Sequence, residues 1–329
     1  MYKRQADKTV YKAAGPKLTV SEEGNDLKVT SSKVNFVFDK KAGVVASYKV
    51  GGTEYFNEGF GIQPNFWRAP NDNDYGSGNP KRLEIWELSS RNFNVTSATG
   101  EIIDGNAIVK VDYKLPAGNQ FLVTYKIYPD GVMNVATHFT PAHLDGVKIG
   151  ISEATATATF SPGRANVSER DKMVVPRIGV RFRLPATMDQ LEYFGRGPLE
   201  NYWDRKNAAY VGLYKNTVTG MEEAYVRAQS MGNRDDVRWL TLKSLDNQGI
   251  RITSKDHLNF SALHFTDPEL WELTYGHDLD NIRRAEVILN LDCIQRGIGN
   301  GSCGPGPRPH YEIEKNKNYS YSFRIENAK

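Results

Sequence analysis

Cysteine, histidine and long apolar runs are all scarce in this chain of 329 residues. Its two cysteines, Cys293 and Cys303, exclude a disulfide scaffold. A single bridge between them stays open, although the sequence favours two free thiols. No apolar run reaches the roughly 18 residues of a membrane-spanning helix, so the sequence predicts no membrane partner.

The shortage of histidine and cysteine also bears on metal sites. Zinc needs three or four such ligands at short spacing, and the six histidines and two cysteines offer no such spacing. The Asx-rich stretch 71–74 does not match a calcium loop, because the fifth position falls on Tyr75 or Gly76 in its two frames. The sequence therefore predicts no metal site and no cofactor in this chain.

Positive and negative charges are nearly balanced, with a formal net charge of +3 at pH 7. Such a chain has no broad cationic field, so no nucleic-acid partner is predicted. Residues 1–12 are polar and lack the apolar core of a signal peptide, and the compartment, cytoplasmic or periplasmic, therefore depends on the full-length protein. Residues 1–18 are predicted to be a linker and residues 19–329 one large domain, since no break in composition divides them.

Short segments of alternating apolar and polar residues recur after the linker, and they predict antiparallel strands. Clear examples begin at Val34, Phe121, Val287 and Tyr319. Residues 178–184 alternate apolar side chains with arginines, which predicts a strand with one apolar face and one charged, outward face. The fold class is therefore predicted to be all-β, with large antiparallel sheets packed face to face.

Helical periodicity is limited to two short stretches. Residues 81–88 predict one helix, and residues 268–275 predict another, with Asp267 as its N-cap and Pro268 at its first position. Both are too short to change the all-β assignment.

Residues 65–76 read N-F-W-R-A-P-N-D-N-D-Y-G and follow no regular period. Phe66 and Trp67 can bury, whereas Pro70 ends any regular element because it fixes φ and lacks an N–H. The four Asx residues that follow predict a rigid polar turn, since such side chains bind their own backbone. The segment is either a structural corner or a loop that carries function.

Three further segments are rich in Gly, Asn and charge. They read F-G-R-G-P-L-E-N-Y-W-D-R at 194–205, Y-V-R-A-Q-S-M-G-N-R-D-D-V-R-W-L at 225–240 and L-D-C-I-Q-R-G-I-G-N-G-S-C-G-P at 291–305. Glu200 and Asp204 could form the carboxylate pair of a glycoside hydrolase. The arginines near them, Arg196 and Arg205, favour structural ion pairs instead. Cys303 would need a histidine base to act as a nucleophile, and a thiol that only lines its loop is favoured.

In order and spacing, these four segments resemble the C-terminal domain of the large bacterial β-galactosidases of glycoside hydrolase family two, also called the small chain. The resemblance covers residues 19–329 and implies the galactose-mutarotase-like β-supersandwich. It implies that the acid/base and nucleophile glutamates lie on a TIM-barrel part outside this chain. This chain would then be a non-catalytic domain or small subunit that completes the rim around a β-galactoside. Residues 1–18 would join an upstream immunoglobulin-like domain, and the resemblance allows Mg or Na in the full enzyme.

The resemblance also assigns roles to residues of this chain, none of them catalytic. The substrate-rim positions are Asp72, Asp74, Tyr75, Gly76, Ser302 and Cys303. The structural positions of the motifs are Trp67, Arg68, Arg196, Glu200, Asn201, Arg205 and Arg234. Two positions depart from the family, because Cys303 stands where the best-known members have a Trp and Ser230 stands where a Glu is usual. The first change removes an aromatic face for the second sugar.

Two other functions stay open at this point. A stand-alone aldose 1-epimerase on the same fold would need a histidine acid and a glutamate base in one cleft. A carbohydrate-binding module would instead stack sugars on exposed aromatics, for which Trp67, Trp203 and Trp271 are the candidates.

Overall fold

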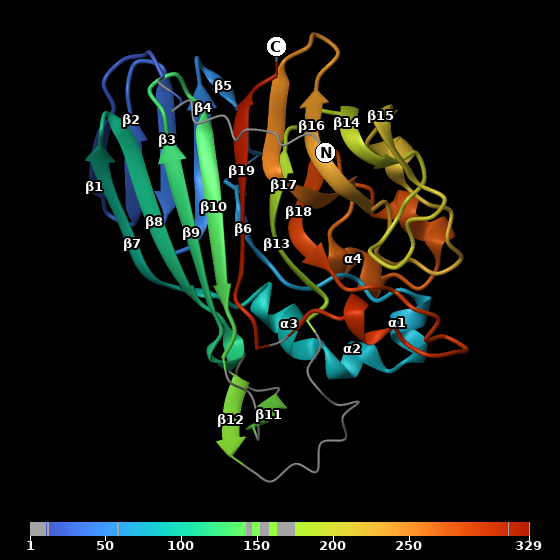
Figure 1. Cartoon of the computed structure of the whole chain (residues 1–329). Coiled ribbons are helices and arrows are strands. Elements are labelled where there is room, and N and C mark those ends of the chain that lie inside the picture. The colour runs from blue at the N-terminus through green and yellow to red at the C-terminus, as the bar shows by residue number, and fades with distance from the viewer. Residues whose placement is uncertain are drawn as a thin grey trace, which may run out of the picture.

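The computed structural model describes residues 11, 13–57, 59–142, 147–151, 158–162, 175–314 and 316–328. Antiparallel strands are the main regular structure of this part of the chain, and short helices gather at one end of it (Figure 1). The predicted all-β class is therefore confirmed. Of the predicted linker, residues 1–10 and 12 lie outside the described residues, whereas Leu18 is already buried in the core.

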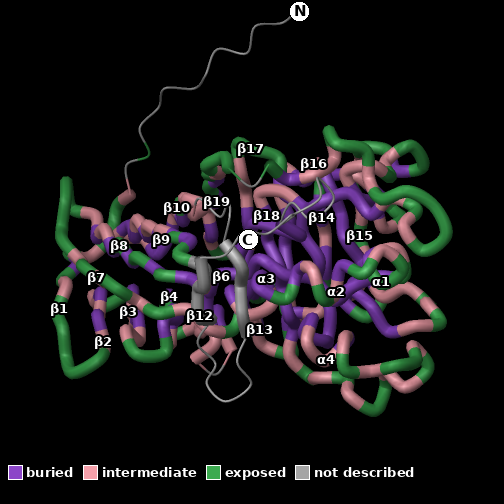
Figure 2. The backbone as a smooth tube through the Cα atoms, turned by 90° about the horizontal axis from the view of Figure 1, so that it is seen from below, coloured by how far each residue is buried: buried purple, intermediate pink, exposed green. Residues whose placement is uncertain are grey.

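The first five strands form their own antiparallel sheet, in which each strand pairs with the next along the chain. They are β1 (Thr19–Glu23), β2 (Asp26–Thr30), β3 (Val34–Asp39), β4 (Val44–Val50) and β5 (Thr53–Glu54). This sheet packs against β9 of the second sheet, since the ring of Phe36 lies 5.5 Å from that of Tyr125. The hydroxyl of Tyr48 also donates across the layer to the Gly131 carbonyl at 2.6 Å. Figure 2 shows buried positions between the two sheets and many more in β13, β14 and β18, beside the helices.

The second sheet has twelve strands. Nine lie side by side in the order β15, β14, β16, β17, β19, β10, β9, β8, β7, while β18, β13 and β6 branch successively from β17. Their bounds are β6 (Gln63–Asn65), β7 (Asn94–Ile103), β8 (Asn106–Lys114), β9 (Gln120–Ile127), β10 (Met133–Thr140), β13 (Arg177–Leu184), β14 (Gln190–Gly197), β15 (Tyr210–Thr217), β16 (Arg234–Lys243), β17 (Gly249–Leu263), β18 (Val287–Gln295) and β19 (Tyr319–Asn327). A separate pair consists of β11 (Val147–Ile151) and β12 (Ala158–Pro162).

The strand predicted at 178–184 is β13, but its second face is not exposed. Arg177 and Arg181 are 1% and 7% exposed, because β6 and β18 flank the strand inside the sheet. Arg177 binds Asp292 of β18 at 2.6 Å and Asp267 at 3.3 Å. The predicted outward charged face is therefore wrong at Arg181, which is buried, whereas Arg183 is half-buried and pairs with Glu286 at 3.6 Å.

Four short α-helices lie at one end of the sheets (Figure 1). They are α1 (Asp72–Gly76), α2 (Asn79–Arg82), α3 (Glu84–Ser89) and α4 (Asp267–Glu272), and 3₁₀ turns occupy Pro116–Gly118, Thr219–Met221, Gly276–Asn281 and Pro309–Tyr311. The helix predicted over 81–88 is present, but it is interrupted at Leu83, which separates α2 from α3. The later helix is present, but its N-cap is Thr266 and not Asp267, since Thr266 and Glu269 form a capping box.

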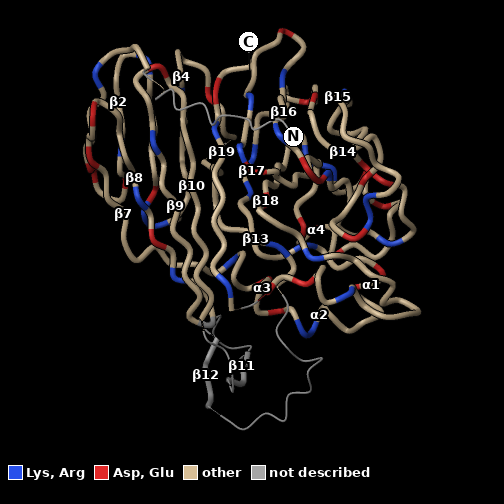
Figure 3. The backbone as a smooth tube through the Cα atoms, in the orientation of Figure 1, with Lys and Arg blue, Asp and Glu red and all other residues tan. Residues whose placement is uncertain are grey.

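Charged residues of both signs are spread over the two sheets and the helices (Figure 3). Within the described part of the chain, no helix combines the length and apolar character that crossing a membrane requires. The apolar side chains form one continuous cluster that extends from the first sheet to the strands beside the helices. The loops at the helical end are therefore mounted on a single packed body.

Candidate functional site

Helix α1 places the residues of the 65–76 segment around one buried ion pair. Arg68 and Asp74 are 2% and 3% exposed, and Nε and Nη2 of Arg68 donate to the two carboxylate oxygens of Asp74 at 3.1 and 3.3 Å. A two-point contact of this kind holds the two side chains in one relative orientation and also pairs their opposite charges. The helix begins at the N-cap Asn71, which forms a capping box with Asp74, so the predicted polar turn is in fact a short helix.

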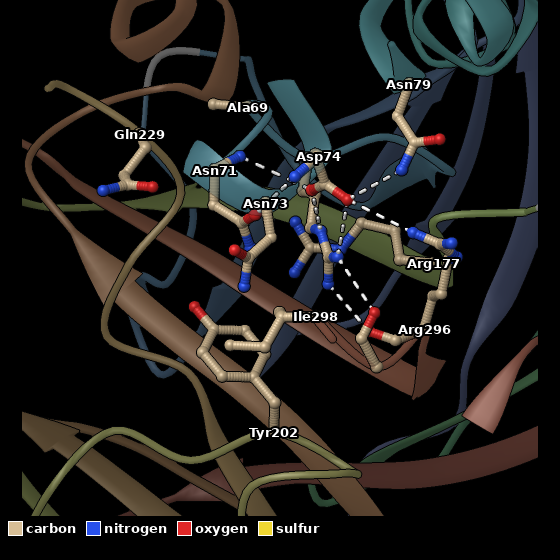
Figure 4. Close-up of polar contacts among 12 residues, drawn as sticks. Ala69, Asn71, Asn73, Asp74, Asn79, Arg177, Tyr202, Gln229, Arg296 and Ile298 are labelled. Carbon is tan, nitrogen blue, oxygen red and sulfur yellow. Dashed lines mark hydrogen bonds and ion pairs between the residues drawn. The ribbon is translucent and has the colours of Figure 1, made fainter. Parts of the chain in front are cut away.

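Asp74 is also the centre of a wider buried network (Figure 4). It accepts hydrogen bonds from Asn79 Nδ2 at 3.1 Å and from Arg296 Nη1 at 3.3 Å. Arg296 in turn pairs with Glu312 at 2.5 and 2.8 Å. Burial works against the charge of Asp74, but the attraction of Arg68 and Arg296 outweighs it and lowers the pKa of the carboxyl.

Asn73 connects α1 to the loop at 297–304. Its Nδ2 donates to the Gly299 carbonyl at 2.5 Å, and its Oδ1 accepts from the N–H and Oγ of Ser302 at 3.3 and 2.8 Å. Gly76 lies against the 297–304 loop, and a Cβ built on it would stand 2.4 Å from the Cα of Ser302. The two segments that the sequence predicts as rim are therefore in direct contact, and their junction requires a glycine.

Glu200, whose predicted partner is Arg196, lies against a different loop. Its carboxylate accepts hydrogen bonds from the hydroxyl of Tyr225 and from the Gly232 N–H at 2.9 Å. Arg196 pairs with Asp236 instead. The prediction is wrong because Arg196 lies within β14 while Glu200 follows the turn after it, so closeness in sequence does not bring the two side chains together.

Asp204, the other carboxylate of the predicted pair, fixes the start of the 297–304 loop. Its oxygens accept from the N–H groups of Ile298 and Gly299 at 3.0 and 2.8 Å. Among the described residues it forms no ion pair with Arg205, and this prediction is also wrong, since two backbone donors occupy the carboxylate. The loop is thus held at its start by Asp204 and further along by Asn73.

Three other motif residues lie inside the scaffold. The side chain of Asn201 donates to the Leu199 carbonyl at 3.0 Å and accepts from the Asp235 N–H at 2.9 Å. Arg234 is 2% exposed and donates to the hydroxyl of Tyr193 at 3.1 Å. Trp67 is a member of the apolar core. These contacts hold the loops in place, and none of the three side chains lines the polar cavity that lies between the loops.

A polar cavity of about 230 Å³, here called the rim cavity, lies where these segments meet. It is lined by Asn71, Asp72, Asn73, Glu200, Tyr202, Arg205, Tyr225, Gln229, Ser230, Ile298 and Ser302. Two predicted rim positions, Asp72 and Ser302, line it, as do the predicted structural positions Glu200 and Arg205. Asp74 lies beneath it as a support, so the structure separates the two aspartates that the sequence groups together.

Tyr75 and Cys303 lie outside the lining, although the sequence predicts them as rim positions. Tyr75 is 55% exposed, and the guanidinium of Arg227 lies 4.4 Å from the centre of its ring. Cys303 is an exposed free thiol and Cys293 a half-buried one, which confirms the two free thiols that the sequence favours. An exposed thiol at this position offers no aromatic face.

Sequence reasoning missed several residues of the rim cavity, among them Tyr202, Tyr225, Gln229 and Ile298. Gln229 belongs to it because its Oε1 accepts from the Asp72 N–H at 2.8 Å across two loops. Figure 4 shows Tyr202 and Ile298 close together near Asn73. All four occur within the quoted motifs, but only contacts between segments distant in sequence identify them.

The lining of the rim cavity limits its chemistry. General acid–base catalysis needs two groups that are free to exchange a proton with substrate, and the Glu200 carboxylate is already held by two donors. No histidine lines the cavity, so the histidine–glutamate pair of an epimerase is not formed there. In the described ranges no group of three His, Cys, Asp or Glu side chains could hold a metal ion.

The aromatic platforms that a carbohydrate-binding module would use are also engaged. Trp67 is 3% exposed, Trp203 packs edge-on against Tyr311 at 5.6 Å, and Arg227 lies over Trp271 at 5.5 Å. The site therefore consists of polar hydrogen-bonding groups on a rigid base. Such a lining suits the hydroxyls of a sugar more than a flat apolar ligand.

The fold and the cavity together define a β-supersandwich with a polar, loop-built site at one end. A family model described as beta galactosidase small chain matches residues 30–325, and the chain belongs to that family. It is 32% identical to a β-galactosidase from Priestia megaterium over 88% of this chain and 25% of that protein. It is 27% identical to one from Halalkalibacterium halodurans over 80% of this chain and 24% of that protein. The chain thus spans about a quarter of the length of these curated relatives.

Solved structures of aldose epimerase-like proteins resemble it in fold only. One is a putative aldose 1-epimerase from Escherichia coli, with 7% identity, a TM-score of 0.44 and coverage of 94% of this chain and 99% of that chain. Another is a galactose mutarotase related enzyme from Lactobacillus acidophilus, with 12% identity, a TM-score of 0.43 and coverage of 92% and 97%.

Proposed function

We propose that this chain is a non-catalytic part of a β-galactosidase that completes the sugar-binding rim of an active site on another part of the enzyme. The acid/base and nucleophile glutamates would lie on a TIM-barrel part that this chain does not contain. The observation that carries the proposal is the joint between α1 and the 297–304 loop, which is fixed by Asn73 and supported by the Arg68–Asp74 ion pair. The family match and the quarter-length coverage of the β-galactosidase relatives support it.

The groups that line the rim cavity would bind sugar hydroxyls. Asp72 is an exposed acceptor, Ser302 supplies a hydroxyl, and Arg205 supplies N–H donors from the opposite loop. Cys303, beside Ser302, would leave the second sugar of the substrate without an aromatic platform. Recognition would therefore rest on hydrogen bonds more than on stacking.

A cation of the full enzyme, Mg or Na, would need several oxygen ligands. Within the described residues Asp74 binds arginines and Asp204 binds backbone N–H groups, so neither carboxylate is a free ligand for a hard cation. Asp72 is a further aspartate in the lining of the rim cavity. No step of the proposed function is therefore assigned to a metal held by this chain.

Complementation tests the proposal. This chain and the remainder of the β-galactosidase are produced separately, and hydrolysis of an aryl β-galactoside is measured for each part and for the mixture. We expect neither part to exceed background and the mixture to gain about 100-fold or more in kcat/KM, because positioning groups contribute effects of that order. Turnover by this chain alone, or a catalytic part that is fully active without it, would contradict the proposal.

A further inference from the structure

A second and larger cavity borders the rim cavity. Its volume is about 400 Å³, and it shares Glu200, Arg205 and Tyr225 with the rim cavity. Its lining also includes Leu199, Asp204, Lys206, Asn207 and Glu223. The shared residues make the two cavities neighbours, and we call the larger one the outer cavity. Its size lies in the range of about 300–1,000 Å³ that is usual for small-molecule sites.

The outer cavity has fixed walls. The hydroxyl of Tyr225 donates to Glu200, which orients the tyrosine ring, and Asp204 is held by the N–H groups of Ile298 and Gly299. Lys206 is held by Asp235 at 2.6 Å. A ligand would therefore meet side chains that are already in place, which reduces the entropy lost on binding.

Two charged groups of the outer cavity are left for a ligand. In the described part of the chain, neither Arg205 nor Glu223 takes part in an ion pair. Burial, together with the charge of Glu200, raises the pKa of Glu223. Asn207 adds an exposed amide. Donors and acceptors side by side on rigid walls match the vicinal hydroxyls of a sugar.

The charges of the lining of the outer cavity favour a neutral sugar over an acidic one. Three carboxylates, Glu200, Asp204 and Glu223, face only two cationic residues, Arg205 and Lys206. An acidic sugar would add a like charge to this surplus. Leu199, which is 59% exposed, supplies an apolar lip for the C–H face of a sugar ring.

We propose that the outer cavity is a subsite for a further, neutral sugar unit, so that the rim and outer cavities hold consecutive units of one substrate. The substrate class would then be neutral β-galactosyl oligosaccharides longer than a disaccharide. This inference rests on the proposed function, since it assigns both units to the leaving-group side of the bond that the catalytic part cleaves.

Binding to this chain alone tests the inference, because the lining residues of both cavities named above belong to it. Ligand-observed NMR titrations would give Kd for methyl β-galactoside, which fills one subsite, for β-1,4-galactobiose, which fills both, and for a β-galactosyl disaccharide that ends in a uronic acid. We expect galactobiose to bind about tenfold more tightly than methyl β-galactoside, and the uronic acid to abolish that gain. The Asn207→Ala/Glu223→Gln double variant should lose the gain and keep the affinity for methyl β-galactoside.

The substitutions lie at solvent-accessible positions, so folding can be verified by an unchanged thermal midpoint, and Leu199→Ser provides an independent variant with the same expected loss. Equal affinity for galactobiose and methyl β-galactoside, a gain that survives in both variants, or no binding of galactobiose would overturn the inference. Complementation would still occur in each of these cases if the proposed function is correct, so the two failures are distinguishable.

Discussion

Replacing Asp74 with alanine is expected to lower the free energy of unfolding by about 3–5 kcal/mol, the range for removal of one partner of a buried ion pair. The variant leaves the guanidinium of Arg68, which is 2% exposed, without a carboxylate. Arg296 keeps Glu312 and is less affected. Equilibrium unfolding in urea measures the change. A loss below about 1 kcal/mol, the ordinary size for a surface contact, would contradict the supporting role of Asp74.

Asp72→Ala is the matched control, because it changes the same residue type on the same helix at an exposed position. We expect its effect on unfolding to stay within about 0.5 kcal/mol. Asp74→Asn adds a pH readout. Since the folded-state pKa of Asp74 is lowered from 3.8, its contribution to stability is present above that pH and is lost as the pH falls through the folded-state value. The asparagine variant should therefore lose less stability than the native chain on acidification below pH 3.8.

Gly76→Ala is expected to reduce kcat/KM of the assembled enzyme by about 100-fold, because a shift of about 1 Å in positioning groups has effects of that size. The added Cβ would stand 2.4 Å from Cα of Ser302 and 2.9 Å from the Gly301 carbonyl, both backbone atoms. The variant therefore has to separate α1 from the 297–304 loop. The measurement is steady-state hydrolysis of an aryl β-galactoside in the complemented mixture.

Gly306→Ala provides the matched control in the same C-terminal region. A Cβ there meets only the Nη2 of Arg296 at 3.8 Å, which is an ordinary contact. We expect its activity to equal that of the native mixture. If Gly76→Ala and Gly306→Ala behave alike, the junction between the two rim segments does not position the substrate.

Regular alternation made the strands predictable where one face is apolar and the other is not. The period of two beginning at Val34 and Phe121 predicts β3 and β9, whose burial patterns alternate as expected. The same rule fails at Arg181 of β13, which it assigns to solvent and which is 7% exposed. Alternation of residue types cannot tell whether a charged side chain meets water or lies buried inside the sheet.

Local signals for caps and pairs were only partly predictive. The sequence signal for the N-cap of α4 is Thr266 three residues before Glu269, the spacing of a capping box. Asp267 is also a common N-cap residue, so residue type alone does not distinguish the two. The arginines next to Glu200 and Asp204 in the sequence did not predict the partners of these carboxylates. Glu200 accepts a hydrogen bond from Tyr225, and Asp204 accepts one from the N–H of Ile298. The motifs predicted which segments form the site, while contacts between distant loops decide which side chains face the cavity.

The location of the reacting carboxylate tests the central claim most directly. A fluorinated galactosyl fluoride that traps a glycosyl-enzyme intermediate is added to the complemented mixture, and the labelled residue is found by peptide mass spectrometry. The account predicts that the galactosyl mass appears on a glutamate of the catalytic part and that this chain keeps its native mass. A label on Glu200, Glu223 or any other carboxylate of this chain would contradict it.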